Sequence, residues 1–341
     1  MMHRFFARPV LAIYLTIALA AAPSRAQGAS QPKLDDRILR AQLFLDSSDF
    51  KPGAIDGRWG EFMHKALTRY EQAQGKSAAD FSDTAPAKFD LPFDSSRPVL
   101  SAYRITESDQ AFVGELPDSH EQQEKLERLP YQNLQELVAE KFHTRRDFLE
   151  QINPDFKWSE AKPGDEVQVP NVATPFDLQA VLDLKKKTDQ AEKADKLKTE
   201  KDKPDNEQAA IFVDVAEKIL EVKRGDKVIG SYPITPGSSA LPAPSGEWFI
   251  RGFAWMPTFR WDEAMLKRGE RSNDSFELPP GPNNPVGIVW MELNRDGIGV
   301  HGTEDPETIG RAASHGCIRL SNWDALDLGQ KVLPGVHVLI P

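Results

Sequence analysis

Apolar residues near the start of the chain recur at the spacing of amphipathic helices. They lie three or four positions apart in two runs, residues 34–45 and 62–73, and so form one face of each helix. The segment between the runs, residues 50–60, contains the turn-forming pairs Pro52-Gly53 and Asp56-Gly57. This pattern predicts two short helices joined by a turn-rich loop.

A second helical pattern follows after residues 76–128, a linker for which the sequence gives no clear structure. Apolar residues between 134 and 142 share one helical face, and the spacing of Thr144 and Asp147 predicts a capping box that starts another helix. Asn153-Pro154 ends that helix. A Pro-Gly-Asp turn then leads into a short strand at residues 166–170.

The tract from 183 to 205 is dominated by lysines and acids and has almost no large apolar residues. Such a segment cannot bury a core, so it is either a solvated helix or a flexible tether. We interpret residues 173–209 as a charged linker.

From residue 210 onward the period changes to that of strands. Short apolar runs alternate with turn residues, which is typical of a barrel or sandwich. The sequence therefore predicts a multidomain α+β protein, in which a mainly β domain at 210–341 follows small helical modules. The expected strands are 211–215, 218–223, 228–233, 247–251, 287–293, 299–301 and 336–340.

The charge balance and the N-terminus restrict the setting in which the chain acts. Its 52 acidic and 42 basic side chains give a net charge of -10, which excludes a general nucleic-acid binder. Residues 1–26 have the basic start, short apolar run and small-residue end of a secretory signal. We therefore expect export to the periplasm or cell envelope. No lipid anchor is expected, and the signal is either cleaved or kept as an N-terminal anchor.

Against this background, a single cysteine is unusual. Cys317 lies in the run Ser-His-Gly-Cys-Ile-Arg-Leu at 314–320, and exported proteins usually keep cysteines in disulfide pairs. We interpret Cys317 as a nucleophile held as thiolate. The alternatives are a buried packing cysteine, or a zinc site formed with His301 and His315.

Neighbouring residues supply candidates for the other catalytic roles. His301 comes from a separate segment and can approach the thiol across the site, so we assign it as the general acid and base, with His315 in support. The backbone amides of Gly316 and Cys317 are candidates for an oxyanion hole. Arg319 is either a ligand for a substrate carboxylate or a structural ion-pair partner.

Taken together, His301-Gly302-Thr303 and the motif at 314–320 resemble the signature of the L,D-transpeptidase (YkuD) family. The likeness covers residues 210–341 and includes Pro242-Ala243-Pro244-Ser245-Gly246, where family members tend to have Thr-Pro-x-Gly. The resemblance implies that Cys317 is the nucleophile and that no metal or organic cofactor is needed. We assign substrate binding to Arg319, Ser314, Gly302 and Thr303.

The two upstream modules also resemble known domains. Residues 33–75, with Gly-Ala-Ile-Asp-Gly-Arg-Trp-Gly between two helices, are similar to a peptidoglycan-binding helical domain. Residues 129–172 resemble a degenerate LysM domain that lacks the usual first strand before Leu134. Each module either binds the cell wall or is a structural spacer.

The family resemblance implies a reaction on peptidoglycan stem peptides. The thiol would displace the terminal D-alanine of a tetrapeptide stem, and an amine of a second stem would resolve the thioester into a 3-3 cross-link. Water or an amine of an envelope protein are the alternative acceptors, and a non-catalytic wall-binding protein is the alternative of another class. Glycan strands are further expected partners, and carbapenems are expected to acylate the same thiol. The long segment 256–285 is predicted to form a lid or groove wall over Cys317.

Overall fold

The computed structural model describes residues 34–77, 82–195, 209–237, 241–311 and 316–341, with the backbone alone at 191–195 and 267–268. Residues 34–341 form one compact unit. The predicted signal at residues 1–26 lies outside the described residues, as do Ser314 and His315. None of the described helices is long and apolar enough to cross a membrane.

Two helices flank the first turn-rich segment, as the sequence predicts. They are α1 (Asp36–Ser47) and α2 (Glu61–Ala73). Gln42 on α1 holds the loop between them, because its Oε1 accepts hydrogen bonds from the backbone N–H of Asp56 at 3.1 Å and of Gly57 at 2.8 Å. Gly57 has a φ of +69°, which glycine adopts without steric cost.

The next part of the chain has the order strand, helices, strand. β1 (Leu100–Arg104) pairs antiparallel with β2 (Glu166–Pro170), and α5 (Leu134–Lys141) and α6 (Arg146–Ile152) lie between them in the chain. β1 falls in the segment 76–128, for which the sequence predicts no clear structure. Short elements complete this part: α3 (Glu107–Gln110), α4 (His120–Gln123) and the 3-10 turn η1 (Trp158–Glu160).

The capping box predicted at Thr144 and Asp147 is wrong. α6 begins after Arg145, whose side chain makes no capping hydrogen bond. The Thr144 hydroxyl instead donates to the carbonyl of Ile55 at 2.6 Å. Because Ile55 lies in the loop between α1 and α2, this hydroxyl joins two helical parts that are distant in sequence.

Part of the charged tract is helical. α7 (Leu178–Asp195) starts before the tract, and Leu178 and Val181 in its first turns are buried. The helix contacts β6 of the sheet described next. Its apolar beginning therefore anchors a helix whose later residues are charged.

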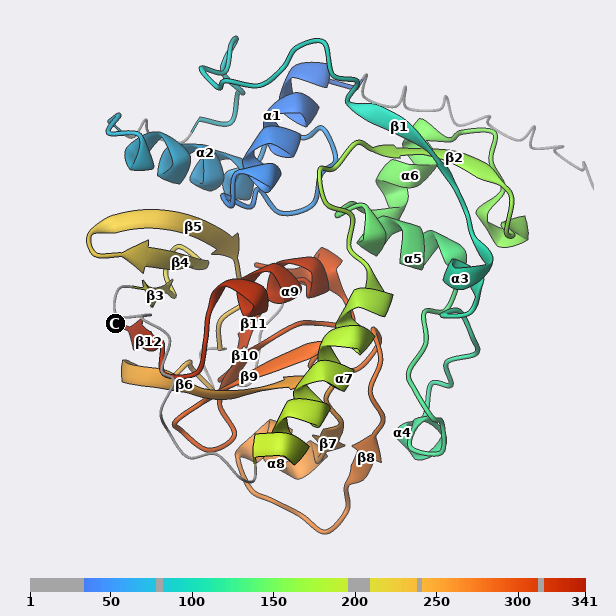
Figure 1. Cartoon of the computed structure of the whole chain (residues 1–341), viewed down its shortest axis with the longest axis vertical. Helices are drawn as coiled ribbons and strands as arrows, with labels where there is room; N and C mark the ends of the chain where they lie inside the picture. The colour runs from blue at the N-terminus through green and yellow to red at the C-terminus, as the bar shows by residue number, and fades with distance from the viewer. Residues whose placement is uncertain (1–33, 78–81, 196–208, 238–240, 312–315) are drawn as a thin grey trace, which may run out of the picture. The chain divides into compact units, whose positions relative to one another are not determined.

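Residues from 209 onward form a mixed eight-stranded sheet with the order β11-β10-β9-β6-β12-β3-β4-β5 (Figure 1). This confirms the predicted α+β class with a mainly β domain. The strands are β3 (Ala209–Asp214), β4 (Ile219–Arg224), β5 (Lys227–Pro233), β6 (Gly246–Trp255), β9 (Val289–Leu293), β10 (Gly299–His301), β11 (Ile318–Arg319) and β12 (His337–Ile340).

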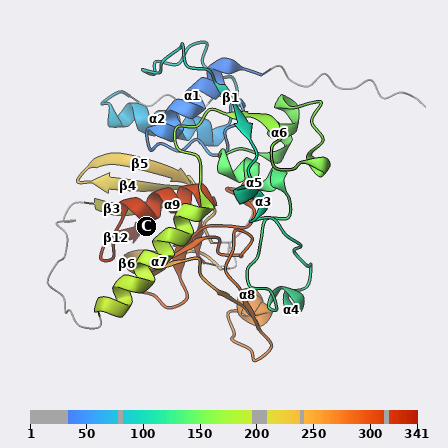
Figure 2. The same cartoon turned by 45° about the vertical axis from the view of Figure 1, so that its right-hand side comes forward.

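The sheet curls, because its two ends are joined. Thr235, just after β5, forms an isolated bridge with Arg319 on β11, with N···O distances of 2.8 and 3.0 Å. α9 (Asn322–Lys331) packs against β9 and β10, and α7 packs against β6. Both helices lie in front of the sheet in Figures 1 and 2.

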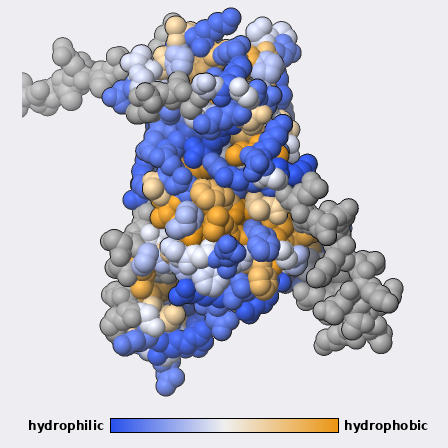
Figure 3. Space-filling view, turned by 90° about the vertical axis from the view of Figure 1, so that its left-hand side faces the viewer, coloured by the Kyte–Doolittle hydropathy of each residue, from blue (hydrophilic) through white to orange (hydrophobic). Residues whose placement is uncertain are grey.

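The helical region covers the exposed edge strand β5. Phe50 bridges to Ser231, and the backbone N–H of Lys51 donates to the Ser231 carbonyl at 2.8 Å. This pairing protects the edge from association with another strand. Figure 3 shows the side of the molecule on the left of Figure 1, where hydrophobic side chains gather in a central area with hydrophilic ones above and below it.

The segment 256–285 contains a small hairpin and a helix. β7 (Phe259–Trp261) pairs with β8 (Phe276–Leu278), and α8 (Glu263–Arg268) lies between them in the chain. β8 contacts α4, and the Trp261 ring stacks on His120 with centroids 4.0 Å apart. The segment thus packs against residues upstream of the β domain.

Candidate active site

Two short parallel strands place His301 beside Arg319 in the sheet. β10 pairs with β11 in the register Val300 with Ile318 and His301 with Arg319. Val300 and Ile318 are fully buried in the core, so the side chains of His301 and Arg319 take the opposite face. Cys317 directly precedes β11 in the chain.

The thiol of Cys317 is partly exposed, and it donates a weak hydrogen bond to the carbonyl of Gly297 at 3.6 Å. Burial raises the pKa of the thiol to about 11, although the backbone of Gly299 and the charge of Arg319 both act to lower this pKa. The thiol is therefore protonated at neutral pH. This corrects the expectation of a resting thiolate, because desolvation outweighs the nearby positive charge.

His301 is buried with the tautomer that a base requires. Its Nδ1 donates to the carbonyl of Gly302 at 2.6 Å, which leaves the Nε2 lone pair free to accept a proton. Burial first, and then the charge of Arg319, lower the pKa of His301 to about 3, while the Gly302 carbonyl acts in the opposite direction. The Trp290 ring stacks on the imidazole with centroids 5.4 Å apart and fixes its plane.

Arg319 links these two groups electrostatically, since its charge lowers the pKa of both His301 and Cys317. Its Nε is buried and has no hydrogen-bond partner among the described residues. A buried donor without an acceptor is costly, so this atom is suited to a ligand that supplies an oxygen.

Gly316 is buried and has a φ of +98°, a conformation that other residues adopt only with strain. A Cβ at this position would contact Ile298. The proposed support by His315 and the substrate contact by Ser314 concern residues outside the described part of the chain, and the zinc alternative also depends on His315.

Asn322, at the start of α9, is a site residue that the sequence analysis missed. Its Oδ1 accepts from the backbone N–H of Ile288 at 3.1 Å and of Thr303 at 3.2 Å, and its side chain is fully buried. A Cβ on Gly302 would clash with this oxygen. Asn322 therefore fixes the turn that follows His301, and no local motif marks it.

Thr303 is also fully buried. Its hydroxyl donates to Glu304 at 3.1 Å and accepts from the backbone N–H of Asp305 at 3.2 Å. These contacts give Thr303 a structural role in the turn after His301. The structure thus places His301 beside Arg319, with Cys317 directly before β11 and with Gly302 and Thr303 in the turn after His301.

Comparison with known proteins finds similarity over the β domain. The model of the L,D-transpeptidase catalytic domain, YkuD, matches residues 208–340. A Bacillus licheniformis protein named as an L,D-transpeptidase, YkuD, is 25% identical over 205 residues, which cover 60% of this chain and 92% of that protein. An Escherichia coli protein named as an L,D-transpeptidase, ErfK/SrfK, is 33% identical over 144 residues, which cover 40% of this chain and 45% of that protein.

Solved structures with detectable similarity carry the same family name. The catalytic domain of the Enterococcus faecium L,D-transpeptidase is 21% identical with a TM-score of 0.30, and the match covers 40% of this chain and all of that domain. An L,D-transpeptidase from Mycobacterium smegmatis is 19% identical with a TM-score of 0.32, covering 39% of this chain and 58% of that one. Residues 208–340 of this chain are thus similar to the YkuD family of L,D-transpeptidase catalytic domains, whose model they match and whose name these relatives carry.

Proposed function

We propose that the chain is a cysteine-dependent L,D-transpeptidase that forms 3-3 cross-links between peptidoglycan stem peptides in the cell envelope. The observation that carries the proposal is the pairing of β10 with β11. It sets the buried imidazole of His301, whose Nδ1 donates to the Gly302 carbonyl, beside the strand that Cys317 directly precedes, and this supports their assignment as base and nucleophile.

In the first half-reaction the neutral thiol of Cys317 and the neutral imidazole of His301 react only when substrate is present. His301 Nε2 removes the thiol proton as Cys317 Sγ bonds to the carbonyl carbon of the third stem residue. The bond to the terminal D-alanine breaks, and that amine leaves with the proton from His301. The product is a thioester on Cys317.

In the second half-reaction an amine of another stem attacks the thioester carbon. His301 takes a proton from that amine and returns it to the departing sulfur, so a new amide forms and the thiol is restored. We assign the unpaired Nε of Arg319 to a substrate carboxylate. The oxyanion role remains with the amides of Gly316 and Cys317, and we assign the helical modules to retention at the wall.

The test is incubation of the protein with purified tetrapeptide stems carrying their disaccharide, followed by mass spectrometry. Dimers that lack one D-alanine are expected. Tripeptide monomers alone would show that water is the acceptor, and a stem joined to a lysine-bearing protein would show attachment. The Cys317→Ala variant should form none of these products. Retained turnover in this variant would refute the thiol mechanism, and a wild type with neither product nor carbapenem adduct would support a binding protein.

A further inference from the structure

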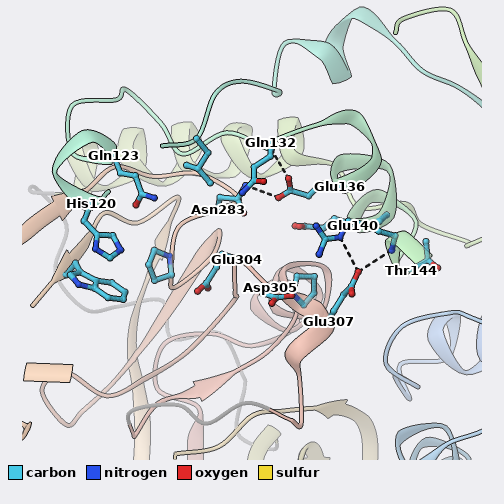
Figure 4. A pocket seen from close by; sticks show the side chains of 16 residues that line it. His120, Gln123, Gln132, Glu136, Glu140, Thr144, Asn283, Glu304, Asp305 and Glu307 are labelled. Carbon is cyan, nitrogen blue, oxygen red and sulfur yellow. Dashed lines mark hydrogen bonds and ion pairs between the residues drawn. The ribbon is translucent and has the colours of Figure 1, made fainter. Parts of the chain in front are cut away.

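A pocket outside the thiol site lies between α5 and the turn after β10. It has a volume of about 350 Å³. Figure 4 shows carboxylates from both sides directed around the same hollow. The acidic side chains that line it are Glu136, Glu140, Glu304, Asp305 and Glu307.

Positive charge in this pocket is scarce and already engaged. Among the described residues that line the pocket, Arg146 is the one lysine or arginine. Its Nε lies 3.3 Å from Glu307 Oε1. His120 also lines the pocket, but burial lowers its pKa and so favours the neutral ring. Four further carboxyl groups therefore share a pocket in which the one permanent cation is paired with Glu307.

Glu140 is the group most in need of a partner. Its residue is 4% exposed, and its Oε1 has no hydrogen-bond partner among the described residues. Burial raises the pKa of this carboxyl to about 8, while the Asn322 and Tyr131 side chains act against the shift and the charge of Glu136 adds to it. A buried acid with an unused oxygen at a pocket wall is suited to a donor that the protein itself does not provide.

The other carboxyls are held in place but not neutralised. Glu136 accepts from the Gln132 backbone N–H at 2.7 Å and from Asn283 Nδ2 at 2.8 Å, which are both uncharged donors. Glu304 accepts from the Thr303 hydroxyl, and burial raises the pKa of its carboxyl. The pocket is thus preorganised for positive charge.

We propose that this pocket binds a primary ammonium group carried by the substrate. No group of three or more His, Cys, Asp or Glu side chains in the described part of the chain is arranged to hold a metal ion, which favours an organic cation. An ammonium offers three donors to separate carboxylate oxygens. The inference rests on the proposed function, and it takes the third stem residue to carry a free side-chain amine.

The pocket is electrostatically connected to the thiol site. Glu304 comes three positions after His301, and the charge of Arg319 acts on the carboxyl of Glu304 as well as on the Cys317 thiol. An ammonium held here would belong either to the donor stem, as a non-reacting group, or to the acceptor stem before it attacks. Both sources share one chemistry, and kinetics separate them.

The decisive variant is Glu140→Gln in the full chain, which keeps the shape of the side chain but cannot ionise beside a bound cation. One arm measures thioester formation, by intact mass, with a donor stem whose amine is free or N-acetylated. The other arm measures cross-linking against hydrolysis of a preformed thioester at rising concentrations of acceptor stem or of a lysine-containing peptide. Glu127→Gln, at an exposed position in the segment before α5, is the matched control.

If the ammonium is the donor's, the wild type should acylate the free-amine donor at least about tenfold faster than the acetylated one, and Glu140→Gln should lose this preference. If it is the acceptor's, Glu140→Gln should need about tenfold more acceptor for the same partition. A lysine peptide that shows the same requirement would identify a protein amine as the acceptor. Unchanged values in both arms would overturn the proposal.

A binding measurement keeps the test independent of how Glu140→Gln folds. Titration of the Cys317→Ala chain with stems should show at least about tenfold tighter binding of the free-amine form than of the N-acetylated form, and equal affinities would overturn the ammonium pocket. A wild type that forms no thioester with any stem would refute the proposed function alone, because the difference in affinity would remain.

Discussion

The thiol site and the acidic pocket are assembled in opposite ways. His301 lies on β10 and Cys317 directly precedes β11, so the backbone pairing of these strands relates the two residues. The pocket instead gathers carboxyls from α5 and from the turn after β10, which only tertiary packing brings together. In the thiol site His301 and Cys317 each donate a hydrogen bond to a backbone carbonyl, whereas Glu140 in the pocket keeps an oxygen without a partner among the described residues. The groups of the thiol site thus have protein partners, and we propose that the pocket receives its partner from a ligand.

Removal of the base should give the largest effect and should confine it to the thiol site. We expect His301→Ala to lower kcat/KM for cross-linking by roughly 10²–10⁴-fold, because it removes the group that we assign as the base for the thiol proton. Steady-state kinetics with muropeptide stems measure this change. Binding of a free-amine stem to the pocket should stay within about twofold, because His301 does not line it.

The control for this variant is His337→Ala, because His337 is exposed on β12. The wild-type rate should also show no inflection near pH 6.5, because the lowered pKa of about 3 leaves His301 neutral and able to act as a base down to acidic pH. An inflection near pH 6.5 that disappears in His301→Ala would contradict the neutral-pair mechanism.

Substitution of Asn322 tests whether the thiol site and the acidic pocket respond independently, because its side chain contacts both. Its Oδ1 holds the turn after His301, and its side chain also hydrogen-bonds the Glu140 carboxyl. Asn322→Ala leaves the buried N–H groups of Ile288 and Thr303 without acceptors, which should lower the free energy of unfolding by about 2–4 kcal/mol. Chemical denaturation measures this loss.

The same substitution should reduce cross-linking and the preference for free-amine stems together. Asn273→Ala, at an exposed position, is the matched control and should change neither. Loss of cross-linking with an unchanged amine preference would show that the two sites respond independently.

Local pattern was sufficient to predict most elements of the β domain. The alternation around 211–215 and 247–251 corresponds to β3 and β6, and the helices α1, α2 and α5 also lie where apolar spacing indicates. β1 was not predicted, because its residues are half-buried or exposed and its partner β2 lies more than sixty positions away. A stretch of a few residues does not reveal a strand whose partner is so distant in the sequence.

The site residues show the same difference between what local sequence predicts and what depends on distant segments. Cys317, His301 and Arg319 were predicted from residue type and spacing, because the chemistry requires those types. The protonation state of Cys317 was not, since it depends on burial that only the folded chain provides. Asn322 and Glu140 act through contacts between distant segments, so a single sequence shows them as ordinary polar residues.

The smallest predicted effect is a dependence of stability on pH that originates at Glu140. The pKa of this carboxyl is about 8 in the folded protein against a usual 4.5, so the folded state binds its proton more tightly than the unfolded state. The stability that this proton contributes is present below pH 4.5 and is lost as the pH rises toward 8. Glu140→Gln has no such proton to lose.

Relative to the wild type, Glu140→Gln should therefore gain about 2 kcal/mol in the free energy of unfolding between pH 5 and pH 7. Urea denaturation of both proteins at each pH, with Glu127→Gln as the control, measures the difference. A bound ammonium should reduce the effect, because a cation beside Glu140 favours its charged form. A difference between the two proteins that stays constant with pH would mean that Glu140 is already ionised in the empty pocket, and the contrast with the neutral thiol site would then be lost.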